Sequence, residues 1–326
     1  MSKSIDLSIV IPLFNEEEVV PFLIQEINKV GATISKNYEV ILVDDGSTDN
    51  TFELIKKASD QDPKFKVIKF SRNFGQQAAL NAGIDFAGGD MVVTMDGDLQ
   101  YPPSLIPEFI KHVENGYDIV IGERLNNEQN NIIREMAGRF FYKVLTLISG
   151  LEFRNANDFA LYNRRVVEVL KKMPERERYL RGIVQWVGFK KKYIKFSVSK
   201  RGGGVPKYNF KKLTGLVLSG ITSFSAFPLR LAFWVGLFVF IVSIAFSTYV
   251  VWDHYANPNP FIAGWATLVI LVLFLGSIQL MVLGVVGEYL YKMFNEVKGR
   301  PLYIISETRN MEDDTMKETS YGIHSM

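Results

Sequence analysis

Residues 91–100 read Met-Val-Val-Thr-Met-Asp-Gly-Asp-Leu-Gln, an apolar run that ends in two aspartates separated by one glycine. The apolar and β-branched residues predict a buried strand, so Asp96 and Asp98 stand where that strand ends. Two carboxylates in this position can present hard oxygen ligands to Mg²⁺ or Mn²⁺. Asp-x-Asp also occurs in ordinary turns, but its place directly after a strand favours the metal-binding interpretation.

Around this stretch, short β-branched runs alternate with helical segments from Leu7 to about residue 122. The βαβα order predicts an α/β fold with a mainly parallel, Rossmann-like sheet, whose ligands bind beyond the carboxyl ends of the strands. The expected strands are Leu7–Pro12, Tyr38–Val43, Phe65–Phe70, Asp90–Met95 and Ile119–Ile121, and the expected helices begin near Glu16, Asp49, Gly75 and Pro103.

Two more of the expected strands end in polar, acidic turns. The second strand is followed by Asp44 and Asp45, and the first ends in Pro12-Leu-Phe-Asn-Glu-Glu17. Ser47 or Asp49 can cap the next helix, and acids in a first helical turn are favourable by themselves. Capping does not explain two consecutive aspartates, whose carboxylates can accept hydrogen bonds from a nucleobase or a ribose.

Apolar residues concentrate after residue 226, although 22% of the whole chain is charged. Leu231–Trp252 is 22 residues without a charge and Phe261–Gly287 is 27 more. Each is enough to cross a hydrocarbon core of about 30 Å at about 1.5 Å per residue. Buried core helices are the alternative, but such lengths without a charge are rare in cores. We therefore expect a two-helix transmembrane anchor over residues 229–290.

Positive charges flank this expected anchor, whereas residues 253–260 between its helices hold no Lys or Arg. The positive-inside rule then places both flanks in the cytosol, and the N-terminus lacks the features of a signal peptide. We expect an integral membrane protein with two spans and both termini cytosolic, ending in a cytosolic tail over residues 291–326. The flanking cations are Lys207, Lys211, Lys212, Arg230, Lys292, Lys298 and Arg300.

Two segments before the anchor combine cations with other features. Residues 200–209 contain three consecutive glycines between cations, which predicts a mobile basic loop at the end of a cytosolic domain over residues 1–209. Residues 210–228 are apolar with lysines near their start, which suits an amphipathic helix in the membrane interface. A soluble helix packed on the first domain remains the alternative.

Composition excludes several function classes. A net charge of +2 is too small for a nucleic-acid binder, and the absence of cysteine removes disulfides, zinc-thiolate sites and cysteine nucleophiles. The three histidines lie away from the acidic strand ends, so no chemistry is assigned to them. Gly284-x-x-Gly287 permits close helix contacts, which leaves a homo-oligomer open.

Several motifs, taken in order, resemble the family-2 glycosyltransferases with the GT-A fold. Within that family they resemble the polyprenyl-phosphate glycosyltransferases related to dolichyl-phosphate mannose synthase. Asn157-Asp-Phe-Ala-Leu-Tyr162 resembles the aspartate-bearing acceptor motif, and the two hydrophobic segments resemble the anchored bacterial glucosyltransferases. The other matching motifs are Ile9-Val-Ile-Pro-Leu-Phe-Asn-Glu-Glu, Val43-Asp-Asp-Gly-Ser-Thr-Asp-Asn-Thr, Ser71-Arg-Asn-Phe-Gly-Gln-Gln-Ala-Ala, Met95-Asp-Gly-Asp-Leu-Gln-Tyr-Pro-Pro and Gly122-Glu-Arg.

The resemblance implies a role for each matching residue. A nucleotide-sugar donor would be held by Pro12, Phe14, Glu16, Asp44, Asp45 and Asp96. The Mg²⁺ or Mn²⁺ ion and the donor diphosphate would be held by Asp96, Asp98 and Gln100. A polyprenyl phosphate acceptor would meet Arg124, Arg134 and Arg139, while Arg201 and Lys207 would close over the site from the basic loop. Asp158 would orient the acceptor, contact a sugar hydroxyl or act as a base, with a helix-start aspartate as the alternative.

The implied reaction is inverting transfer of a hexose, foremost glucose from UDP-glucose, to an undecaprenyl-type phosphate at the cytosolic face of a bacterial inner membrane. GDP-mannose or a modified aminoarabinose donor stays open. Because a phosphate acceptor is already an oxyanion, cations that offset phosphate repulsion matter more than a base. A processive polysaccharide synthase would carry Gln-x-x-Arg-Trp, where this chain has only Gln185-Trp186. A non-catalytic sugar-nucleotide-binding membrane protein is disfavoured by the acidic and arginine residues.

Overall fold

The computed structural model describes residues 5–34, 36–125, 157–173, 175, 178–197, 227–256 and 264–311. These residues belong to two compact units. The first unit contains the described residues up to 197 together with 300–311, and the second contains residues 227–256 and 264–299.

An eight-stranded sheet forms the centre of the first unit, in the order β7-β5-β6-β4-β1-β2-β3-β8. The four neighbours β4, β1, β2 and β3 run parallel, while β6 is antiparallel to both β4 and β5, and β8 is antiparallel to β3. The strands are β1 (Leu7–Leu13), β2 (Tyr38–Asp44), β3 (Phe65–Phe70), β4 (Met91–Thr94), β5 (Ile119–Leu125), β6 (Ala160–Asn163), β7 (Lys191–Ser197) and β8 (Ile305–Arg309).

The sheet is therefore mixed, whereas the sequence predicted a mainly parallel one. The parallel part was predicted correctly, because its strands are the buried apolar runs that alternate with helices. The antiparallel strands β6 and β8 are only 4 and 5 residues long and lie outside that alternation.

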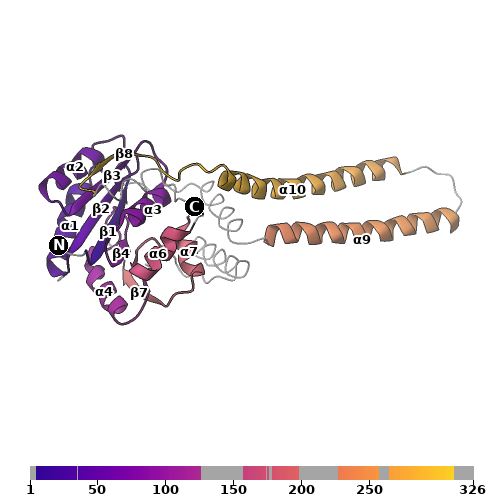
Figure 1. Ribbon diagram of the computed structural model, residues 1–326. Helices are drawn as coiled ribbons and strands as arrows, with labels where there is room; N and C mark the ends of the chain where they lie inside the picture. The colour runs from indigo at the N-terminus through magenta and orange to yellow at the C-terminus, as the bar shows by residue number, and fades with distance from the viewer. Residues whose placement is uncertain are drawn as a thin grey trace. The chain divides into compact units, whose positions relative to one another are not determined.

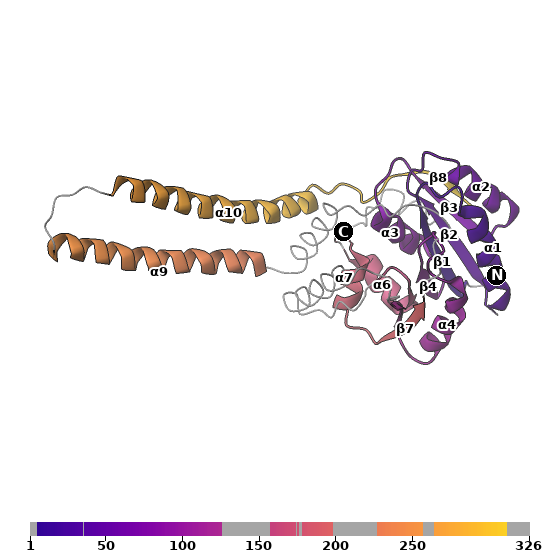
Figure 2. The ribbon, with the colours of Figure 1, turned by 180° about the vertical axis from the view of Figure 1, so that it is seen from behind.

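Helices cover both faces of the sheet, which gives three layers (Figures 1 and 2). Successive strand residues point to opposite faces, so Ile9 and Ile11 pack in one core cluster and Val10 in the other. One cluster contains residues of α1 (Val20–Thr33), α2 (Thr51–Gln61) and α4 (Ile106–Glu114), which follows the 3-10 turn Pro103–Leu105. The other contains residues of α3 (Gln76–Phe86), α6 (Arg164–Lys172) and α7 (Leu180–Trp186).

This topology brings several chain segments to one edge of the sheet. The carboxyl ends of the parallel strands β1, β2 and β4 lie at the same edge. Because β6 runs antiparallel to β4, its first residue pairs with the last residue of β4, and Asp158 lies just ahead of it. The acidic turns expected at the strand ends therefore lie at one edge, together with Asp158.

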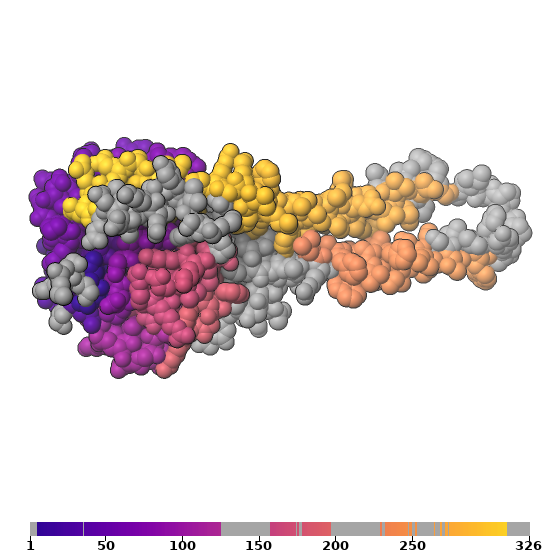
Figure 3. Space-filling model, viewed as in Figure 1, coloured from indigo at the N-terminus to yellow at the C-terminus, as the bar shows by residue number. Residues whose placement is uncertain are grey.

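Part of the expected C-terminal tail belongs to the sheet. Residues 305–309 form β8 against β3, and the backbone amide of Ser71 donates to the carbonyl of Ile304 at 2.9 Å. Tyr303 is fully buried, and its ring stacks on that of Phe70 with centroids 5.1 Å apart. In Figure 3 the yellow C-terminal segment lies against the violet surface of the first unit.

The second unit is a helical hairpin of α9 (Phe227–Ala256) and α10 (Trp265–Val297), which lie side by side (Figure 1). By length and composition, one segment of the described residues, Phe274–Val297, can cross a membrane, and Ala232–Phe246 is a shorter apolar segment. Many large apolar side chains of both helices are exposed. The basic loop at 200–209 and the interfacial helix expected at 210–228, up to residue 226, lie outside the described residues.

Candidate active site

Asp96 and Asp98 lie in the turn that leaves β4. The turn is tight: Leu99 has a positive φ of 58°, and the amide of Gln100 donates to Asp98 Oδ1 at 3.1 Å. Removal from water, together with the neighbouring carboxylates of Asp158 and Asp98, raises the pKa of the Asp96 carboxyl to about 7. Negative charge is thus concentrated at this turn, and a bound cation would relieve the repulsion.

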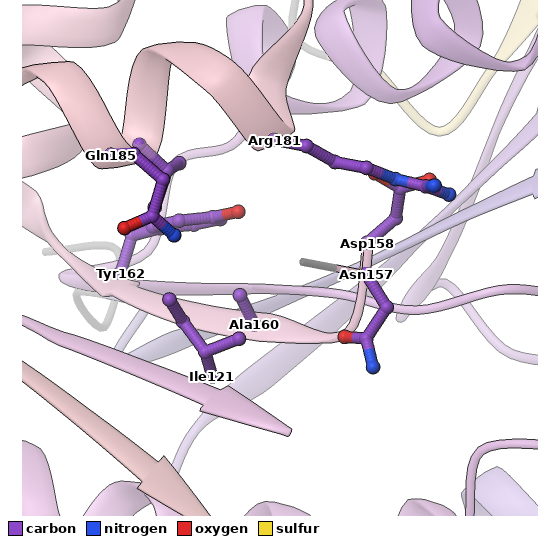
Figure 4. A pocket seen from close by; sticks show the side chains of 8 residues that line it. Ile121, Asn157, Asp158, Ala160, Tyr162, Arg181 and Gln185 are labelled. Atoms are coloured by element: carbon purple, nitrogen blue, oxygen red, sulfur yellow. The ribbon is translucent and has the colours of Figure 1, made fainter. Parts of the chain in front are cut away.

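Asp158 forms an ion pair with Arg181 of α7. Arg181 Nε donates to Asp158 Oδ1 at 2.9 Å and Nη2 donates to Oδ2 at 2.6 Å, so the contact is bidentate. The Asp158 side chain is 1% exposed and that of Arg181 is 29% exposed. The Thr94 hydroxyl donates to the Asp158 carbonyl at 2.6 Å, which fixes the backbone beside β4. In Figure 4 the guanidinium lies against the carboxylate at one end of a small pocket that Tyr162 and Gln185 also line.

Two glutamines at the start of α3 connect these carboxylates. The amide nitrogen of Gln76 donates to Asp96 Oδ1 at 2.6 Å and lies 3.4 Å from Asp158 Oδ2. Gln77 Nε2 lies 3.3 Å from both oxygens of Asp158, and its Oε1 accepts from the amide of Leu180 at 3.1 Å. Asp96, Asp158 and the start of α7 are therefore joined in one hydrogen-bond network.

The acidic pair after β2 has two different environments. Asp45 accepts from the amides of Phe74 at 2.7 Å and Gly75 at 2.9 Å, so its carboxylate holds the segment that leads into α3. Asp44 Oδ1 accepts from the amide of Ser47 at 3.2 Å, whereas its buried Oδ2 has no hydrogen-bond partner among the described residues. Burial raises the pKa of both carboxyls. Asp44 Oδ2 is thus a buried acceptor atom at the end of β2.

The turn after β1 is fixed to the turn after β2. The amide of Asn15 donates to the hydroxyl of Ser47 at 3.0 Å, and the amide of Glu16 donates to Thr51 Oγ1 at 2.8 Å. Pro12 pairs with Val43 in the sheet, and the Phe14 side chain is exposed at the same edge. The N-cap of α2 is Asn50, without a side-chain cap hydrogen bond, so neither Ser47 nor Asp49 takes the capping position that the sequence suggested. Asp49 Oδ1 accepts from the amide of Thr51 at 3.0 Å.

The other predicted site residues are distributed as follows. Arg124 is exposed near the end of β5, whose direction brings it to the same edge, and Gln100 is partly buried in the turn after Asp98. Arg134, Arg139, Arg201 and Lys207 lie outside the described residues. The structure adds residues that sequence reasoning did not assign, namely Gln76, Gln77 and Arg181. The glutamines stand in a matching motif, which was an available signal, whereas nothing around Arg181 in the sequence marks it.

The residues at this edge fit a divalent cation that the donor helps to bind. Among the described residues, no group of three or more His, Cys, Asp or Glu side chains could hold a metal ion without other ligands. Mg²⁺ commonly takes one or two carboxylates and completes its shell with substrate phosphates and water. The turn at 96–98 offers two such carboxylates, Asp96 and Asp98, and the pKa of the Asp96 carboxyl is raised.

The three-layer α/β domain with an acidic turn after β4 is consistent in its architecture with the GT-A class of glycosyltransferases. Residues 8–171 match the model of glycosyl transferase family 2, and residues 227–293 match that of the GtrB C-terminal hairpin. The chain belongs to glycosyl transferase family 2.

Known proteins match the chain over nearly its whole length. An uncharacterized glycosyltransferase of Synechocystis sp. is 37% identical over 310 residues, which cover 95% of this chain and 97% of that protein. The SfII prophage-derived bactoprenol glucosyl transferase of Shigella flexneri is 37% identical over 303 residues, covering 93% of this chain and 98% of that protein.

The mannosyl-3-phosphoglycerate synthase of Rubrobacter xylanophilus has a similar fold, with a TM-score of 0.51, 15% identity and coverage of 69% of this chain and 74% of that one.

Proposed function

We propose that this glycosyltransferase moves glucose from UDP-glucose to a polyprenyl phosphate at the cytosolic face of the membrane. The observation that carries the proposal is the match to bactoprenol glucosyl transferases across both units, the α/β domain and the helical hairpin. A lipid acceptor also explains why a sugar-transfer domain and an apolar hairpin occur in one chain.

In the proposed reaction, an oxygen of the lipid phosphate bonds to the anomeric carbon of glucose. The bond from that carbon to UDP breaks, and UDP leaves with the electron pair, so the anomeric configuration inverts. Because the attacking group is already an oxyanion, no residue has to remove a proton. Asp158 directs both oxygens to Arg181, which suits a residue that orients cationic groups rather than a general base.

We assign the donor to the edge formed by the turns after β1, β2 and β4. Asp44 offers its unpaired Oδ2 to the nucleoside, beside Pro12, Phe14 and Glu16. Asp96, Asp98 and Gln100 hold Mg²⁺ or Mn²⁺ with the donor diphosphate. The cation supplies positive charge where the leaving diphosphate becomes negative. Arg124, Arg134, Arg139, Arg201 and Lys207 are proposed to meet the phosphates of acceptor and donor.

The substrate assignment is tested with a panel of donors and one lipid phosphate. The full-length protein in detergent should release UDP from UDP-glucose with Mn²⁺, and polyprenyl phosphate should raise that rate at least about tenfold over hydrolysis by water. GDP-mannose and a modified aminoarabinose donor should react more slowly. Faster reaction of another donor would replace glucose, and no release from any donor would favour a sugar-nucleotide-binding protein.

We also propose that α9 and α10 both cross the membrane, with residues 1–225 and 290–326 in the cytosol. α9 has 30 residues and α10 has 33, each longer than the roughly 20 that a span requires. The absence of Lys and Arg from residues 253–260 supports an outside location for that loop.

Cysteine labelling tests this topology, because the natural chain has no cysteine. A reagent that cannot cross membranes should label Asn257→Cys in intact cells. The same reagent should label Asn50→Cys, which is exposed on the first unit, only after lysis. The cysteine-free parent protein is the control. Labelling of Asn50→Cys in intact cells would contradict the proposed orientation.

A further inference from the structure

Helix α3 carries three polar side chains at four-residue intervals, Gln77, Asn81 and Asp85. Residues four apart lie on one face of a helix, so the three form a line along α3. The rest of α3 from Ala78 to Phe86 is buried and mostly apolar. Buried polar groups are costly unless they are hydrogen-bonded, so the partners of this line indicate its purpose.

All three side chains hold the segment 178–181, which carries Arg181. Gln77 Oε1 accepts from the amide of Leu180, and Asn81 Nδ2 donates to the carbonyl of Arg178 at 2.9 Å. Asp85 Oδ1 pairs with Arg178 Nη1 at 3.0 Å, and both of these side chains are nearly inaccessible to water, at 2% and 7% exposed. The segment just before Arg181 is therefore attached to α3 at three successive levels, twice through its backbone and once through the Arg178 side chain.

The two ends of this line reach different parts of the unit. At one end, Gln77 contacts Asp158, whose carboxylate forms the ion pair with Arg181. At the other end, Asp85 Oδ2 accepts from the hydroxyl of Tyr303 at 3.1 Å. Tyr303 lies in the C-terminal segment that follows α10 in the chain and continues into β8.

We propose that Gln77, Asn81 and Asp85 form a polar ladder that positions Arg181 against Asp158 and makes that position depend on docking of the C-terminal segment through Tyr303. Because a buried ion pair often adds little net stability compared with apolar residues of similar volume, we attribute the Arg178–Asp85 pair to placement of the segment that carries Arg181. The ladder residues do not touch substrate; they act through Arg181. The activity measured in the following test is the glucosyl transfer proposed above, so this part of the inference rests on that proposed function.

The test uses the full-length protein with two mild variants, Asn81→Ala and Tyr303→Phe. Asn81→Ala removes two hydrogen bonds, to the carbonyls of Arg178 and Gln77, and Tyr303→Phe removes one. They should lower kcat by about tenfold and about threefold respectively, while the Kd of UDP stays unchanged because Asp44 is untouched. The matched control is Ser306→Ala. It removes a different hydroxyl of the same segment, the one that donates to the Lys69 carbonyl at 3.2 Å, and should leave kcat at the parental value.

Combination with Arg181→Gln separates positioning from general destabilisation. If the ladder acts through Arg181, neither Asn81→Ala nor Tyr303→Phe will lower kcat further in the Arg181→Gln protein. Their effects on the thermal unfolding midpoint should likewise be non-additive with that of Arg181→Gln, although Tyr303 and Arg181 have no direct hydrogen bond or ion pair.

Independent, additive effects in both measurements would overturn the ladder, as would a Ser306→Ala effect equal to that of Tyr303→Phe. The unfolding measurement needs no substrate. It therefore tests the ladder even if the parent protein turns over no donor, a result that would count against the proposed function alone.

Discussion

Asp98→Asn is expected to reduce glucosyl transfer by at least about 10³-fold while the protein stays folded. The change removes an anionic oxygen ligand but keeps the side-chain volume, and Asp98 lies in a turn rather than in the core. Its backbone contact to Gln100 can be kept by the amide oxygen of asparagine. The measurement is the initial rate at saturating Mn²⁺ beside a thermal unfolding curve.

Asp90→Asn is the matched control for this prediction. Asp90 is an exposed aspartate at the opposite end of the same strand, directly before β4, so its loss should leave the rate at the parental value. Donor titration gives a second readout, since Mn²⁺ should tighten UDP binding in the parent protein and much less in Asp98→Asn. Parental turnover in folded Asp98→Asn would refute the metal assignment.

Arg181→Gln is expected to have the next largest effect, lowering turnover by about 10²-fold and the free energy of unfolding by about 3 kcal/mol. The variant leaves the Asp158 carboxylate buried without its cation, and the described residues that still hydrogen-bond it are the amides of Gln76 and Gln77. It also removes a positive charge that acts on the Asp96 carboxyl of the acidic turn.

A second substitution separates the two effects of Arg181→Gln. The double variant Asp158→Asn/Arg181→Gln buries no unpaired charge, so it should regain most of the lost stability while turnover stays low. Lys29→Gln removes a cation from an exposed ion pair with Glu26 and is the control, expected to change stability by less than about 1 kcal/mol. Recovery of turnover in the double variant would mean that Arg181 has a structural role only.

The sequence was sufficient for the parallel half of the fold. The strands beginning at Leu7, Tyr38 and Phe65 start where the apolar runs predicted. Their burial on both faces makes them continuous hydrophobic segments, which is a strong local signal. The acidic turns were predicted for the same reason, because they interrupt those runs at the strand ends.

The remaining parts depend on contacts between distant segments. β8 has the sequence Ile-Ser-Glu-Thr-Arg, which is mostly polar, as is common in edge strands. Its sequence therefore does not distinguish it from an unstructured tail, and its assignment as a strand depends on its pairing with β3. Arg181 is 23 residues from Asp158 in the sequence. The two side chains meet because Asp158 precedes β6, which pairs antiparallel to β4, and Arg181 lies at the start of α7. Asp45 was assigned to the nucleotide, but its carboxylate holds the amides of Phe74 and Gly75, so its predicted contact with the donor remains a proposal.

The central claim is tested most directly by identifying the lipid product. The full-length protein is incubated with isotopically labelled UDP-glucose, polyprenyl phosphate and Mn²⁺, and the extracted lipid is analysed by mass spectrometry. The proposed reaction predicts a lipid that gains one labelled hexose, keeps a single phosphate and appears in equal amount with UDP. A lipid that gains a hexose phosphate, or UDP formed together with free glucose and no glycolipid, would contradict it.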